Sequence, residues 1–141
     1  MTYSAVLTSK ANAAAIGHLL RSDHQEDLCF ALWRPSTGKH RQSALITRIV
    51  LPKEGERNVH GNASFNPQYF ERVIGLALRE GMGIAFMHSH VGPGWQDMSP
   101  DDIRAEHGRA AASMAVTGRP QVGLTLGTDR AWSARHSFPA R

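Results

Sequence analysis

The chain has a single cysteine, Cys29, among its 141 residues, so it cannot form an internal disulfide. Unpaired cysteine is typical of reducing compartments, and we therefore expect a cytoplasmic protein. No apolar run approaches the roughly 18 residues that a transmembrane helix needs, which predicts that the chain does not enter a membrane. The first residues also lack the basic start and the long apolar stretch of a signal peptide.

Concentrated charge is missing as well. The net charge is only +4, and the arginines and lysines are scattered along the sequence. Nucleic-acid-binding proteins usually gather such charge on one stripe with aromatic residues between, so we expect no nucleic-acid partner. A hydrophobic content of 41% is that of an ordinary globular protein. The length suits one compact domain over residues 1–141.

Hydrophobic periodicity predicts that strands and helices are mixed along the chain. Strands are expected over residues 2–7, 28–33, 44–51, 83–87, 122–126 and 131–137. Helices are expected over residues 9–21 with Ser9 as cap, over 67–80 after Asn66, and from 100 to about 117 after Ser99. Residues 34–38 and 53–63 are expected to form a turn and a loop. This order favours an α+β or α/β fold, a mixed β-sheet flanked by helices.

Two histidines stand one residue apart at the end of the apolar stretch over residues 83–87. Residues two apart in a strand point to the same face, so His88 and His90 can face one ion while Ser89 points away. A catalytic zinc site needs three nitrogen or oxygen ligands and one open position. Asp102, beyond a Gly/Pro loop, can supply the third ligand. The segment from Ser99 to Asp102 is also nearly a helix capping box, and the two roles can coexist.

A longer pattern, Glu…His-Ser-His…Ser-x-x-Asp, resembles the JAB/MPN (JAMM) zinc metallopeptidases. Its residues here are Glu26, His88-Ser89-His90 and Ser99-Pro100-Asp101-Asp102. The intervening Gly-Pro-Gly-Trp-Gln is similar to a bacterial branch that accompanies ubiquitin-activating-like and ubiquitin-conjugating-like proteins in antiphage defence operons. The resemblance covers nearly the whole chain and implies a JAB/MPN-like (cytidine-deaminase-like) fold. It also implies a deubiquitinase-like zinc peptidase that cleaves after the C-terminus of a bacterial ubiquitin-like protein.

The resemblance assigns a role to each site residue. His88, His90 and Asp102 would hold the zinc ion that activates a water molecule. Glu26 would take the proton of that water and pass it to the leaving amine. Ser99 would donate a hydrogen bond to the developing oxyanion.

Spacing leaves the third ligand open, because eight residues separate His90 from Ser99 where the family has seven. Asp101 is therefore the alternative to Asp102. Trp95, in the same loop, is either a packing anchor or a wall of the groove that binds an extended substrate tail.

The general base has a rival too. Asp27 adjoins Glu26, and Cys29 stands where the family has a glycine three residues after the glutamate. A free cysteine inside an apolar strand usually behaves as a small buried hydrophobe, so Cys29 is not expected to be a nucleophile. His24 could reach the rim of the site. Most of the remaining histidines are expected to be solvated: His18, His40, His60, His107 and His136.

Two other functions fit the same residues. One is a non-catalytic JAB/MPN scaffold, whose shifted aspartate would not bind metal. The other is a zinc hydrolase acting on a small sulfur-carrier conjugate or a small amide. The apolar side of the last helix is expected to consist of Ile103, Ala110, Ala111 and Met114.

Overall fold

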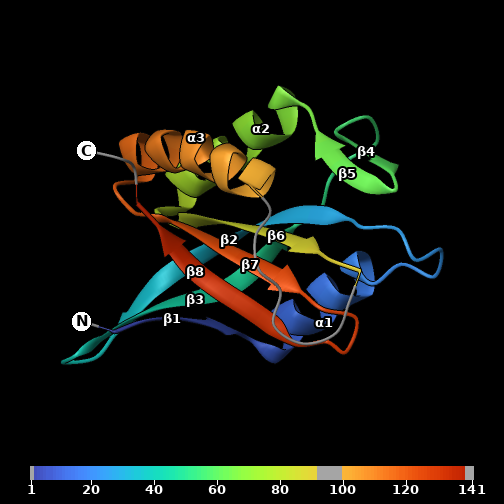
Figure 1. Ribbon diagram of the computed structural model, residues 1–141. Helices are drawn as coiled ribbons and strands as arrows, with labels where there is room; N and C mark the ends of the chain where they lie inside the picture. Colours follow the sequence, from blue (N-terminus) through green and yellow to red (C-terminus); the bar gives the residue numbers. More distant parts are fainter. Residues whose placement is uncertain (1, 92–99, 139–141) are drawn as a thin grey trace.

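The computed structural model describes the backbone of residues 2–91 and 100–138, and within them all side chains except those of residues 2, 37, 100–103 and 107. Six strands form one mixed sheet in the order β1-β3-β2-β6-β7-β8 (Figure 1). Their bounds are Thr2–Leu7 (β1), Leu28–Thr37 (β2), Arg41–Val50 (β3), Gly83–Ser89 (β6), Gln121–Leu126 (β7) and Trp132–Ser137 (β8). A separate hairpin is formed by β4 (Arg57–His60) and β5 (Asn62–Phe65). The helices are α1 (Ser9–Leu19), α2 (Pro67–Glu80) and α3 (Pro100–Thr117).

These elements confirm the expected mixture of helices and strands around a mixed sheet. The β1–β3 and β6–β7 pairs are parallel, and the other neighbouring strands of the sheet are antiparallel. The connection from β6 to β7 is a crossover through α3, as parallel neighbours require. Among the described residues, no helix is long and apolar enough to cross a membrane.

Helices cover both faces of the sheet. Helix α1 packs on one face, and α2 and α3 lie together on the opposite face (Figure 1). Successive residues of β6 alternate between the two cores: Met87 belongs to the α1 core and Ile84 to the α2 core, where the half-buried Phe86 packs against it. This alternation places His88 on the face covered by α2 and α3.

The two outer strands of the sheet approach each other around α1. His136 on β8 lies with its Nε2 3.0 Å from the carbonyl oxygen of Ser4 on β1, and its ring lies 5.0 Å from that of Tyr3. The Trp132 indole of β8 donates to Asn12 of α1 at 2.9 Å. The sheet is therefore curled over this helix.

Three local expectations were wrong. Thr8, not Ser9, caps α1, since its hydroxyl accepts from the Ala11 N–H at 3.1 Å. Strand β2 continues beyond Trp33 to Thr37, because only β3 borders it there and the missing N–H of Pro35 leaves no partner unpaired. The expected loop over residues 53–63 contains most of the β4–β5 hairpin, which reverses at Gly61 with a positive φ of 88°.

Gly83→Ala is expected to destabilise the fold by about 1–3 kcal/mol, the usual cost of overpacking a core. A Cβ at residue 83 would lie 2.3 Å from Cε2 of Trp33, whose indole is fixed by a 3.1 Å hydrogen bond to the Ile84 carbonyl. Denaturant unfolding measures the change. Gly75→Ala in α2 is the control: its Cβ meets open space, so it should stabilise the helix by up to about 1 kcal/mol. Two substitutions of equal effect would contradict the packing argument.

Candidate functional site

The histidine pair lies where β6 ends. His88 is in the strand and buried, whereas His90 follows the strand and is half-buried. Their ring centroids are 4.7 Å apart with the planes at 80°. Two imidazoles bound to one tetrahedral zinc at about 2.1 Å per bond have centroids about 5 Å apart. This spacing of the two rings is compatible with a shared ion and is also that of an ordinary edge-to-face ring pair, so the shared ion stays a prediction.

Glu26 lies two residues before β2, the strand that neighbours β6. The antiparallel register pairs Leu28 of β2 with His88, and the Ser89 N–H donates to the Asp27 carbonyl at 3.0 Å, one step further along. Continuing this register by one residue would bring Glu26 opposite His90. Both residues line a pocket of about 250 Å³ between the end of α1 and the end of β6. His24 lines the same pocket.

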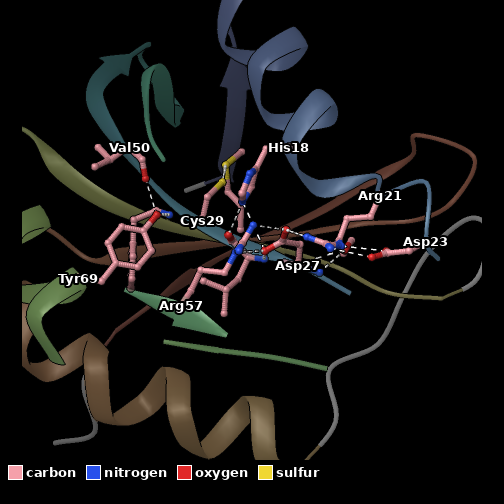
Figure 2. A network of polar contacts seen from close by, with 12 residues as sticks. His18, Arg21, Asp23, Asp27, Cys29, Val50, Arg57 and Tyr69 are labelled. Carbon is pink, nitrogen blue, oxygen red and sulfur yellow. Dashed lines mark hydrogen bonds and ion pairs between the residues drawn. The ribbon is translucent and has the colours of Figure 1, made fainter. Parts of the chain in front are cut away.

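Asp27 does not line this pocket, and cations enclose it. Its side chain is 0% exposed, and its two oxygens accept hydrogen bonds from Arg57 at 2.9 Å and from Arg21 at 3.1 Å (Figure 2). The His18 ring lies 3.5 Å away, and the Leu28 N–H donates to the carboxylate at 2.8 Å. Burial alone would raise the pKa of Asp27, but these partners outweigh it and hold the pKa at about 2. A carboxylate so fully occupied is a poor proton acceptor, which favours Glu26 over Asp27 as the base.

The remaining motif residues lie in or next to the segment 92–99, which is outside the described residues. Asp101 and Asp102 occupy the first turn of α3, but their side chains are not described, so the choice between them stays open. Ser99 and Trp95 lie outside the described residues. Within residues 2–91 and 100–138, leaving out the side chains not described, no group of three or more His, Cys, Asp or Glu could hold a metal. The structure thus brings together two of the three expected ligands and the expected base.

A second pocket, of about 210 Å³, is lined by His88 and lies between β5, β6 and α3. Its apolar walls include Phe65 and Phe86, and the Phe86 ring stacks on His88. The guanidinium of Arg109 lies 4.2 Å from the centroid of the Phe86 ring. Glu106 also lines this pocket, although it is only 3% exposed.

Two histidines expected to be solvated are instead structural. His18 lies with its Nε2 2.8 Å from the Leu28 carbonyl and also approaches Asp27, and His136 contacts Ser4 across the sheet edges. Cys29 is fully buried in β2, and burial raises the pKa of its thiol, so it is unsuited to act as a nucleophile.

The sequence was also compared with known proteins. No model of a known protein family matches the chain, and no curated protein matches it. The case for its function therefore depends on its own residues.

Proposed function

We propose that this chain is a JAMM-type zinc metallopeptidase of JAB/MPN-like fold that cleaves after the C-terminus of a bacterial ubiquitin-like protein. The observation that carries the proposal is the convergence of His88, His90 and Glu26 at one end of the sheet. Two ring nitrogens suited to one ion, with a carboxylate on the adjacent strand, are the parts that metal-assisted hydrolysis of an amide needs.

Metal binding would use both histidines and an aspartate from the first turn of α3, Asp102 rather than Asp101. Three nitrogen or oxygen ligands leave the fourth position open, as catalytic zinc sites require. Zinc held there supplies a water nucleophile near neutral pH and polarises the scissile carbonyl.

The chain's own residues would manage the proton and the developing charge. Glu26, half-buried at the pocket, would take a proton from the attacking water and return it to the leaving lysine ε-amine or main-chain amine. Ser99, next to the start of α3, would donate a hydrogen bond to the oxyanion.

The surroundings of the histidines support an extended polypeptide as substrate. Pockets of about 250 Å³ and about 210 Å³ flank the pair, one beside His90 and the other beside His88. A chain terminus bound across both would pass the metal position, and Trp95 would wall the groove. We further propose that the enzyme removes or processes the modifier of an antiphage conjugation system, alongside its activating-like and conjugating-like enzymes.

The decisive test measures zinc content and cleavage together, using a bacterial ubiquitin-like protein fused to a reporter. Wild type is expected to contain about one zinc ion per chain and to cut after the last residue of the modifier. His88→Ala should lose both the zinc and the cleavage because a ligand is gone. His40→Ala, at an exposed turn remote from both pockets, is the control and should keep both.

Two results would overturn the proposal. Wild type with zinc but an intact fusion would indicate a hydrolase of small sulfur-carrier conjugates or small amides instead. Wild type with no zinc would indicate a non-catalytic scaffold.

A further inference from the structure

A series of hydrogen-bonded side chains connects His88 to the neighbouring strands and to α3. It begins at Thr125 on β7, which is directly opposite His88 in the parallel β6–β7 register. The Thr125 hydroxyl oxygen lies 3.1 Å from Nε2 of His88. Thr125 is 0% exposed, so its hydroxyl cannot exchange this partner for water.

The hydrogen-bonded series continues through Arg135 of β8 to Glu106 of α3. Arg135 donates from Nη1 to the Thr125 hydroxyl oxygen at 3.4 Å and from Nε to Oε2 of Glu106 at 2.8 Å. Glu106 is buried, and the absence of a side chain at Gly123 makes room for it, because a Cβ there would lie 2.3 Å from Oε1 of Glu106. The ion pair on α3 and β8 thus holds the threonine that contacts His88.

The Thr125 hydroxyl can pair with either tautomer of His88. Arginine only donates, so the Thr125 oxygen accepts from Arg135, and the hydroxyl can then either accept from an Nε2–H of His88 or donate its proton to an unprotonated Nε2. The second arrangement leaves the proton on Nδ1 and no ring nitrogen for a metal, so a metal-binding His88 requires the first. A histidine that binds a metal through one ring nitrogen almost always donates from the other, and that bond fixes its tautomer and ring orientation. A nitrogen that donates to Thr125 cannot bind a metal at the same time, which leaves Nδ1 of His88.

From these contacts we infer that Thr125, held by Arg135 and Glu106, is the positioning residue that orients the His88 imidazole for metal binding through Nδ1. The inference deepens the proposed function and rests on it. None of the three residues touches the reacting atoms; they act through His88.

Thr125→Val tests the inference, since valine keeps the shape of threonine and removes the hydroxyl. Its zinc affinity, measured by competition with a chromophoric chelator, is expected to fall by about 10–100-fold, the usual effect of losing such an outer partner. The visible absorption of the Co²⁺-substituted protein should also change because the ligand field changes. Thr125→Ser restores the hydroxyl and should return both measurements close to wild type. In ¹⁵N spectra of the wild-type zinc protein, Nε2 of His88 should carry the proton.

Thr117→Val is the matched control. It removes a threonine hydroxyl that also forms a hydrogen bond, to the Ser113 carbonyl near the end of α3. This hydroxyl is not part of the hydrogen-bonded series that reaches His88. Its zinc affinity and Co²⁺ spectrum should equal those of wild type. Glu106→Gln keeps the shape of the glutamate side chain and weakens its ion pair with Arg135. It should therefore lower the zinc affinity, as Thr125→Val does.

The outcomes separate this inference from the proposed function. If wild type binds zinc and Thr125→Val binds it equally well with an unchanged Co²⁺ spectrum, the positioning role is wrong and the peptidase proposal stands. Failure of Thr125→Ser to restore the affinity would also refute the role. If wild type binds no zinc, the proposed function fails and the inference fails with it.

Discussion

Glu26→Gln is expected to slow cleavage of the modifier fusion by about 10²–10⁴-fold, the usual contribution of a general base. Glutamine keeps the size of glutamate but cannot accept the proton of the attacking water. Its zinc content should remain at the wild-type level, because the proposed ligands are His88, His90 and an aspartate of α3. Steady-state kcat on the fusion, with zinc measured on the same preparation, tests both statements.

Glu54→Gln is the control, since it neutralises an exposed glutamate that lines neither pocket. It should leave kcat unchanged. Full activity of Glu26→Gln would show that another group is the base. Loss of zinc together with activity would instead make Glu26 a metal ligand or a structural residue.

Asp27→Asn is expected to lower the free energy of unfolding by about 3 kcal/mol, the lower end of the cost of breaking a buried ion pair. Asparagine accepts fewer hydrogen bonds and leaves the Arg21 and Arg57 guanidinium groups facing a neutral group. Both arginine side chains are 27% exposed and can partly turn to water, which limits the loss. Urea unfolding at neutral pH gives the value.

Asp23→Asn provides the comparison. Asp23 also pairs with Arg21, at 2.7 Å, but its side chain is 41% exposed, so its loss should cost much less than the loss of Asp27. Equal costs for the two variants would contradict the structural role of Asp27.

The stability of the protein should also depend on the ionisation of Asp27 at acidic pH. The pKa of Asp27 is depressed from 3.8 to about 2 in the folded chain, so its stabilisation is present above the unfolded pKa and is lost as the pH falls through the folded one. This depression corresponds to roughly 2 kcal/mol lost between about pH 4 and pH 2. That part of the pH dependence should be missing in Asp27→Asn.

Local sequence signals predicted the elements whose ends are set by neighbouring residues. Helix α2 begins after the Asn66 cap and ends before Gly81, as expected, and Gly81 adopts the left-handed conformation. The β4–β5 hairpin has only Gly61 as a local signal. It depends on tertiary contacts, namely the bonds from Arg57 to Asp27 and the packing of Phe65 on Phe30, which no periodicity within residues 53–63 reveals.

The site divides in the same way. A spacing of two residues was enough to predict that the His88 and His90 side chains are neighbours, as their ring contact shows, because strand geometry is local. Thr125, Arg135 and Glu106 come from three elements far along the chain. The sheet register brings the first two to His88, and the packing of α3 on the sheet brings Glu106 to Arg135.

Helix α3 shows why Glu106 was missed. The apolar spacing predicted Ala110 and Ala111 on the buried side, and Ala110 is buried, but Ala111 is exposed. The described residues that are buried on this helix are Glu106, Ala110 and Ser113. Two of them are polar and form hydrogen bonds to side chains on β7 and β8, so hydrophobicity alone could not identify this face.

The meeting of β1 and β8 around α1 has a consequence for how the molecule behaves among its neighbours. The outermost strands of an open sheet normally offer unpaired backbone groups to strands of other chains, which is a route to fibrillar aggregation. Here the His136 side chain of β8 lies against β1, with its Nε2 3.0 Å from the Ser4 carbonyl oxygen and its ring beside that of Tyr3. This contact between the two margins of the sheet hinders an incoming strand from docking at that point of β1, and so helps to protect the chain at the high concentrations of a crowded cell.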